Sequence, residues 1–125
     1  MKTAILPPDA AKPLAPYTPA ILAGDTLYLS GQIALDAQGN LHTADIATET
    51  RKVMDNVGAL LQAAGMGYEH LVKVTIFMSD MAHYAAVNEV YGTYFGDTPP
   101  AREAVAVKGL PRGVNVEISG IAVRS

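Results

Sequence analysis

The stretch LVKVTIFM, residues 71–78, decides the fold of this 125-residue chain. It is a nearly continuous run of apolar and β-branched residues, which is typical of a central strand of a sheet. Helical periodicity precedes it over residues 46–64 and follows it over residues 81–95. A strand between two amphipathic helices indicates a domain in which helices pack on a sheet.

The helix predicted at residues 46–64 is the clearest element of the sequence. Its apolar stripe consists of Ile46, Val53, Val57, Leu60, Leu61 and Ala64. Asp45 is suited to cap its amino end, and Gly65 is suited to follow its carboxyl end. The second helix is predicted to start after Ser79-Asp80 and to end at Gly96. Its apolar stripe consists of Met81, Tyr84, Val87, Tyr91, Tyr94 and Phe95.

The remaining sequence predicts strands before and after these helices. A short edge strand, an extended proline-rich arm and a hairpin around Gly24-Asp25 come first. The chain then continues to Leu35, with a bend expected at Gly31. The predicted strands span residues 2–6, 20–22, 26–30, 71–78, 101–108 and 114–123. The order β-β-β-α-β-α-β-β indicates one α+β domain, residues 1–125, with a mixed β-sheet and two helices on one face. The other face stays open unless another subunit covers it.

The composition favours a self-associating protein without a membrane segment. Half of the residues are hydrophobic, only 17% are charged, and the mean hydropathy is +0.18. No apolar run approaches the roughly 20 residues that span a bilayer, and the amino terminus lacks the pattern of a signal peptide. A chain this apolar is expected to bury surface against a second copy, so a homo-oligomer is predicted.

Charge and residue types exclude several classes of function. The net charge is −3 without a basic cluster, which disfavours nucleic-acid binding. The absence of cysteine excludes disulfides and thiolate chemistry and fits a cytoplasmic protein. His42, His70 and His83 lack the spacing of metal ligands, so no metal site is expected. Ser30-Gly31-Gln32 has no nucleophile-elbow pattern, so a serine nucleophile is not expected.

Arg102 and Glu117 are the two candidate catalytic residues. Each charge lies in a segment that otherwise has the pattern of a buried or half-buried strand, and charged residues are rarely buried without a partner. The arginine could bind a carboxylate through two parallel N–H groups, and the glutamate could order a water molecule. The alternatives are an exposed arginine or one paired with Asp97 or Glu103, and a glutamate on a solvated face.

The relative position of these two charges depends on the loop between their strands. A hairpin with four loop residues, 109–112, would pair Lys108 with Gly113 and place Arg102 and Glu117 on the same face of the sheet. A loop of five residues would place the two charges on opposite faces. Both arrangements remain open.

Asn88 and Tyr17 are further candidates. Asn88 interrupts the apolar stripe of the second helix, so it either faces solvent or serves a site. Tyr17 lies between prolines in the extended arm, where it could form a lid or pack on the surface.

The ordered set of motifs resembles the Rid (reactive intermediate deaminase) family, also called YjgF, over nearly the whole chain. Its most specific part is Pro100-Ala101-Arg102, followed by Leu110-Pro111 and the segment VEISGIA at residues 116–122. The other matching segments are residues 15–17, 28–33, 55–57, 63–65, 74–77 and 87–91.

The resemblance implies a chorismate-mutase-like homotrimer with ligand clefts between subunits. It implies hydrolysis of enamines and imines, such as 2-aminoacrylate and its imine tautomer, to 2-oxo acids and ammonia without a cofactor. By position, Arg102 would bind the substrate carboxylate and Glu117 would orient or activate the attacking water. Tyr17, Ser30 and Asn88 would line the cleft.

Three positions depart from the common pattern of the family. Glu103 follows the arginine where Ser or Thr is frequent, Ala104 replaces a frequent cysteine, and Ser119 replaces a frequent second glutamate. These changes bear on substrate range, and a regular strand would direct Glu103 away from Arg102. Two other functions remain open: a regulatory or small-carboxylate-binding trimer without catalysis, and an aminoacrylate deaminase of pyrimidine breakdown.

Overall fold

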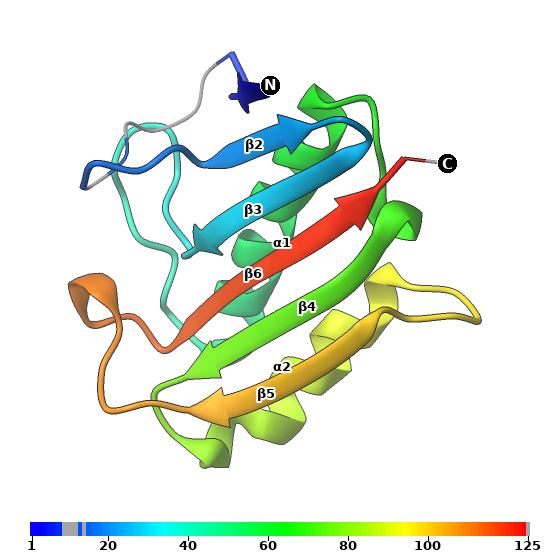
Figure 1. Ribbon diagram of the computed structural model, residues 1–125. Coiled ribbons are helices and arrows are strands. Elements are labelled where there is room, and N and C mark those ends of the chain that lie inside the picture. Colours follow the sequence, from blue (N-terminus) through cyan, green and yellow to red (C-terminus); the bar gives the residue numbers. More distant parts are fainter. Residues whose placement is uncertain (9–12, 14, 125) are drawn as a thin grey trace.

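The computed structural model describes residues 1–8, 13 and 15–124, and it confirms the predicted order of elements (Figure 1). The strands and helices are β1 (Lys2–Ile5), β2 (Ala20–Ala23), β3 (Thr26–Gln32), α1 (Ile46–Ala63), β4 (Leu71–Met78), α2 (Tyr84–Tyr91), β5 (Ala101–Ala106) and β6 (Val116–Val123). Part of the predicted proline-rich arm, residues 9–12 and 14, lies outside the described residues.

The strands form one six-stranded mixed sheet in the order β1-β2-β3-β6-β4-β5. β4 and β5 are parallel, and the other neighbouring strands are antiparallel. Both helices lie behind the sheet on the same face, which confirms the predicted α+β arrangement (Figure 1). β4 lies inside the sheet between β6 and β5, as its apolar sequence predicts.

Side chains along each strand point alternately to a buried face and to an open face of the sheet. On β4, Val74, Ile76 and Met78 are at most 1% exposed and form the core with α1. The buried residues of α1 include Val53, Met54, Val57, Leu60 and Leu61. The alternate residues of the strands point to the face that Figure 1 turns toward the viewer, where the described residues form no second layer. Apolar side chains on it include Tyr28, Phe77, Val105, Ile121 and Val123.

The predicted hairpin of β5 and β6 is wrong, because β4 lies between these two strands. β5 runs parallel to β4, and α2 provides the crossover that two parallel neighbours require. The chain then passes the end of β4 to reach β6. The 3₁₀ turn Pro111–Gly113 lies in this connection, with positive φ angles at Arg112 and Gly113.

The prediction for α1 is confirmed at both ends. The Asp45 carboxylate accepts a hydrogen bond from the backbone N–H of Thr48 at 2.7 Å, and Gly65 has a φ of 74° after the carboxyl end.

The second helix is shorter than predicted. Asp80 caps a 3₁₀ turn, Met81–His83, before α2, and a second 3₁₀ turn, Gly92–Tyr94, follows it. Gly92 is a poor residue for the interior of a helix, which is consistent with the early end of α2.

No helix in the described ranges is long and apolar enough to cross a membrane.

Candidate active site

Arg102 projects from β5 into the helical layer, where α2 holds its guanidinium group. Its Nη1 donates a hydrogen bond to Oδ1 of Asn88 at 2.7 Å, and its Nη2 donates one to the hydroxyl oxygen of Tyr84 at 3.3 Å. The guanidinium carbon lies 5.0 Å from the ring centroid of Tyr91 and 5.8 Å from that of Tyr84. Both distances are within the range of cation–π attraction. The group is therefore held in a defined orientation.

The spacing of these contacts follows from the geometry of α2. Tyr84, Asn88 and Tyr91 are related as i, i+4 and i+7, which places them on one face of a helix. The β4-α2-β5 crossover lays that face over β5. Asn88, the polar residue that interrupts the apolar stripe, therefore contacts Arg102. Of the two interpretations left open by the sequence, exposure to solvent or a role in a site, the structure favours the second.

The alternative ion pairs of Arg102 with Asp97 or Glu103 are not among those formed by the described residues. Glu103 points to the open face, where its carboxylate lies 2.9 Å from Nζ of Lys73 and accepts a hydrogen bond from Thr75 at 2.9 Å. The bond to Lys73, followed by that to Thr75, lowers the pKa of Glu103. A guanidinium group has five N–H donors, of which α2 engages two, so three remain for a ligand.

Glu117 points to the open face of the sheet, where Phe77 is its neighbour on β4. Its side chain is half-buried, and this burial raises the pKa of the carboxyl group. None of the ion pairs in the described part of the chain includes Glu117. A carboxylate with a raised pKa accepts a proton more readily, which suits a general base.

Glu117 lines a cavity of about 230 Å³ between the amino-terminal arm, the end of β3 and the loop before β6. The other lining residues are Ala15, Tyr17, Ser30, Gly31, Ile33 and Pro111. Tyr17, Ser30 and Glu117, three of the predicted site residues, therefore lie at one cavity. Apolar walls with a few polar groups are typical of sites for small organic ligands.

Ser30 holds the arm that carries Tyr17. Its hydroxyl donates a hydrogen bond to the carbonyl oxygen of Thr18 at 2.6 Å, and its backbone N–H donates one to the carbonyl oxygen of Pro19 at 2.8 Å. The arm is thereby joined to β3 next to the cavity. The contact of the Ser30 hydroxyl is thus a backbone carbonyl of the arm rather than a side-chain base.

Gly31 makes room for the Glu117 carboxylate. The pairing of β3 with β6 shifts between Leu29 and Gln32, so the bend predicted at Gly31 takes the form of a bulge. A Cβ atom at Gly31 would overlap the carboxylate of Glu117. A larger residue would therefore displace the candidate base.

A buried carboxylate fixes the start of β6, immediately before Glu117. Glu49 on α1 is 0% exposed, and its Oε2 accepts hydrogen bonds from the backbone N–H groups of Asn115 at 2.7 Å and Val116 at 2.8 Å. Its Oε1 accepts a third bond from the side-chain amide of Asn115 at 3.0 Å. These bonds join α1 to the strand that carries Glu117.

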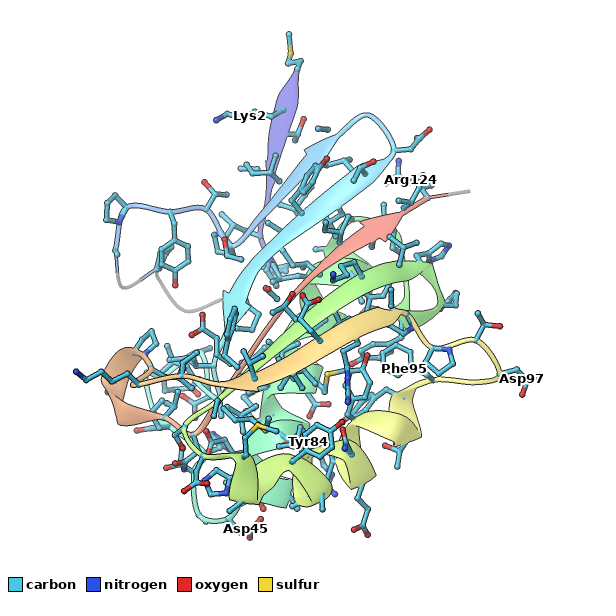
Figure 2. The ribbon with its side chains drawn as sticks, turned by 60° about the horizontal axis from the view of Figure 1, so that its bottom comes forward. Lys2, Asp45, Tyr84, Phe95, Asp97 and Arg124 are labelled. Carbon is cyan, nitrogen blue, oxygen red and sulfur yellow. The ribbon has the colours of Figure 1, made fainter. Side chains whose placement is uncertain are left out.

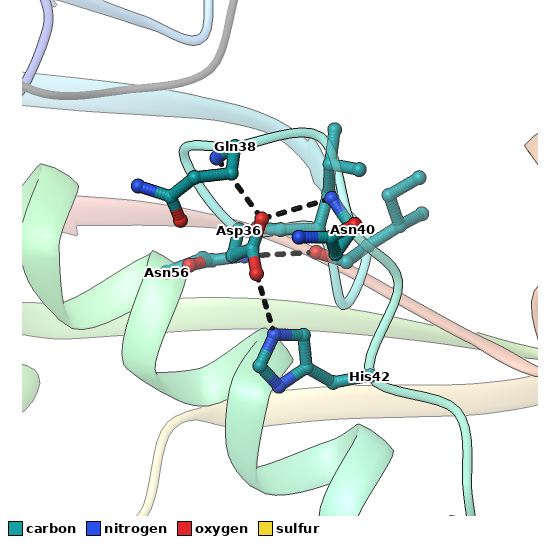
Figure 3. Close-up of polar contacts among 7 residues, drawn as sticks. Asp36, Gln38, Asn40, His42 and Asn56 are labelled. Carbon is teal, nitrogen blue, oxygen red and sulfur yellow. Dashed lines mark hydrogen bonds and ion pairs between the residues drawn. The ribbon is translucent and has the colours of Figure 1, made fainter.

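A second polar cluster holds the loop that begins at the cavity (Figure 3). The Asn56 amide donates hydrogen bonds to the carbonyl oxygens of Ile33 and Leu35, both at 2.9 Å. The Asp36 carboxylate lies 2.9 Å from Nε2 of His42 and accepts a bond from the backbone N–H of Asn40 at 2.8 Å. These contacts, the one to His42 first, lower the pKa of Asp36 to about 2.

The predicted site residues form two groups on opposite faces of the sheet. Arg102 and Asn88 lie on the helical side, where Arg102 is aligned with Val74 of β4. Glu117 lies on the open side, aligned with Phe77, three residues further along the same strand. The opposite-face arrangement left open by the sequence is thus observed, although the hairpin assumed for it is absent. A single chain does not bring the two charges together.

The sequence did not predict a role in the site for several residues that contact Arg102 or line the cavity. Tyr84 and Tyr91 were assigned to an apolar stripe, although their spacing from Asn88 marks one helix face. Gly31 and Pro111 line the cavity through a bulge and a loop, which have no periodic signal. Among the described residues, no group of three or more His, Asp or Glu side chains could hold a metal ion.

Comparison with known proteins gives a consistent result. Residues 8–124 match a family model described as Endoribonuclease L-PSP. A RutC family protein from Pyrococcus horikoshii is 44% identical over 125 residues, covering 99% of each chain. The 2-iminobutanoate/2-iminopropanoate deaminase of Mus musculus is 41% identical over 112 residues, covering 89% of this chain and 83% of the mouse protein. The crystal structure of E. coli TdcF with bound serine matches with a TM-score of 0.92 at 35% identity, covering 98% of this chain and 99% of TdcF.

Proposed function

The chain belongs to the Rid (YjgF/RutC) family, and from this membership we propose that it hydrolyses small 2-imino acids and their enamine tautomers to 2-oxo acids and ammonia. The proposed substrates include 2-iminopropanoate and its tautomer 2-aminoacrylate. The mouse relative carries the name of this activity. The observation that supports the proposal most is Arg102, which α2 holds with three N–H groups left for a carboxylate.

The proposed active unit is a homotrimer in which each cleft lies between two subunits. One subunit would provide Arg102 and Asn88, and its neighbour would provide Glu117, Tyr17 and the cavity. The opposite orientation of the two charges in one chain supports this division. The apolar open face supports the association, because surfaces of this kind are usually covered by a partner.

In the proposed reaction, Arg102 binds the substrate carboxylate and thereby directs the imine carbon toward Glu117. Glu117 accepts a proton from a water molecule, whose oxygen forms a bond with the imine carbon while the π electrons of the C=N bond move to nitrogen, which takes a proton from solvent. The resulting carbinolamine then loses ammonia: the protonated Glu117 returns its proton to the amino nitrogen, the C–N bond breaks, and the carbonyl of the 2-oxo acid forms as the hydroxyl proton passes to solvent. Because an imine is already electrophilic, positioning and a held water are sufficient aids.

A test of this activity generates imino acids in situ with an amino-acid oxidase and traps them with semicarbazide. The protein should lower the rate of semicarbazone formation in proportion to its concentration, while the 2-oxo acid accumulates. Arg102→Ala is the matched control and should leave trapping unchanged. Trapping that is equally fast with and without the parent protein would contradict the proposed activity.

A non-catalytic carboxylate-binding role is the second candidate, because the TdcF relative was solved with bound serine, a stable amino acid. This role predicts saturable binding of 2-oxo acids or amino acids without turnover of imines. The endoribonuclease named in the family description receives less support, because a chain with a net charge of −3 has little attraction for a phosphate backbone.

A further inference from the structure

Tyr84 differs from the other side chains that contact Arg102, because it combines a hydrogen bond with substantial exposure. Its hydroxyl oxygen accepts the Nη2–H bond at 3.3 Å, and its side chain lies between α2 and β5 (Figure 2). Tyr84 is 40% exposed, whereas Tyr91, which stacks on the same guanidinium group, is 5% exposed. Tyr84 therefore lies at the solvent side of the arginine.

The contacts of Arg102 restrict different motions of its guanidinium plane. Tyr91 lies against the group within cation–π range and limits its displacement toward the core. Asn88 accepts from Nη1, which fixes one end of the fork. With these two contacts alone, Nη2 could still swing toward solvent. The hydroxyl of Tyr84 provides the acceptor that holds Nη2.

We propose that Tyr84 is a positioning residue that holds the Arg102 guanidinium in the orientation needed to bind a substrate carboxylate bidentately. The proposal rests on the proposed function, because it takes Arg102 as the carboxylate anchor. An arginine side chain is rich in rotamers, and one that is already ordered loses less conformational entropy when the ligand binds. The hydroxyl of Tyr84, rather than its ring, is the group that matters for this role.

Tyr84→Phe removes the hydroxyl and keeps the ring. We expect the dissociation constant for an unreactive 2-oxo acid, and the KM for the imine, to rise roughly three- to ten-fold. This is the effect of losing a hydrogen bond of ordinary strength, because the bond to Tyr84 is exposed and, at 3.3 Å, long. The kcat value should stay close to that of the parent, because the reacting atoms are unchanged. Tyr94→Phe is the matched control: the hydroxyl of Tyr94 is directed at Arg51 and Asp55 of α1 and does not contact Arg102.

A double-mutant cycle with Arg102→Lys separates positioning from a general effect on α2. Lysine has a single ammonium group instead of a planar guanidinium group that must be oriented. Tyr84→Phe should therefore have no further effect on 2-oxo acid affinity in the Arg102→Lys background. Equal effects of Tyr84→Phe in both backgrounds would overturn the proposal, since they would show that Tyr84 acts independently of the arginine. Unchanged affinity in the single Tyr84→Phe variant would overturn it as well.

The binding readout also distinguishes failure of this proposal from failure of the proposed function. If the parent binds 2-oxo acids and Tyr84→Phe binds them equally well, only the role of Tyr84 is wrong. If the parent binds no 2-oxo acid at any accessible concentration, Arg102 is not a carboxylate anchor, and both proposals are wrong. If the parent binds 2-oxo acids, Tyr84→Phe weakens binding and no imine is hydrolysed, Tyr84 keeps its positioning role at a binding site without catalysis.

Discussion

Arg102 and Glu117 project from opposite faces of one sheet, at positions three residues apart along their common neighbour β4. Arg102 contacts α2, whereas Glu117 lines a cavity on the open side. Two groups held in this way cannot act on one small molecule within one chain. The proposed chemistry therefore requires the open face and β5 of neighbouring subunits to meet.

Glu117→Gln tests whether the carboxylate activates water. The amide keeps the shape of the side chain but cannot accept the proton, so kcat should fall roughly 10²- to 10⁴-fold. Affinity for an unreactive 2-oxo acid should change far less, or increase as a negative charge leaves the cleft. Turnover, affinity and thermal midpoint should be measured on one preparation. Unchanged turnover in a stable protein would remove Glu117 from the mechanism.

The pKa of the Glu117 carboxyl group can be measured to test whether this side chain is partly buried, as the structure shows. Burial disfavours the charged form, so the carboxyl group should stay protonated to a higher pH than an ordinary glutamic acid, whose pKa is 4.5. Carbon-13 NMR of the side-chain carboxyl groups, with Glu117→Gln to assign the signal, measures this pKa directly. The acidic limb of the pH–rate profile should follow it. A midpoint at or below 4.5 would contradict the described environment.

Asp36 should make the stability of the protein dependent on pH in acid. Its pKa is lowered to about 2 by its contacts with His42 and the backbone of Asn40, against an ordinary value of 3.8. Because the folded state lowers this pKa, the stabilisation is present above pH 3.8 and is lost as the pH falls through about 2. Thermal midpoints between pH 5 and pH 2 should therefore fall less steeply in Asp36→Asn than in the parent. Identical slopes would show that the contact contributes nothing.

Two substitutions at Glu49 distinguish hydrogen bonding from charge. Glu49→Gln should be tolerated, because its carbonyl can accept from the N–H groups of Asn115 and Val116, and its amide can donate to the Asn115 side chain after that side chain turns over. Glu49→Leu leaves three donors without partners and should lower the free energy of unfolding by about 3 kcal/mol or more. Denaturant titrations of both variants provide the measurement. Equal destabilisation by Gln and Leu would show that the negative charge is essential.

The sequence predicted those parts of the molecule that depend on local signals. The apolar run of β4 and the stripe and caps of α1 depend on neighbouring residues, and all of them are confirmed. Arg102 and Glu117 were identified because a charge in an apolar strand needs an explanation. The face on which each lies was not determined, because it depends on the parallel pairing of β5 with β4, which is a long-range contact.

The contacts that surround the candidate residues were harder to predict for a related reason. Tyr84 and Tyr91 have the same spacing as core residues, and their second role becomes visible only when β5 lies beneath α2. Glu49 is a charged residue that does not belong to the predicted apolar stripe of α1, yet it is fully buried. Its partners are backbone N–H groups of β6, which carry no sequence signal.

The central claim, that each active site combines Arg102 of one subunit with Glu117 of another, is tested most directly by mixing two inactive variants. Arg102→Ala and Glu117→Ala subunits, each inactive alone, are dissociated, mixed in equal amounts and reassembled. In a ring of three subunits with head-to-tail interfaces, random assembly pairs an intact arginine with an intact glutamate at about a quarter of the clefts. We therefore predict recovery of about a quarter of the parent activity, whereas mixed trimers that form without any recovered activity would contradict a site shared between subunits.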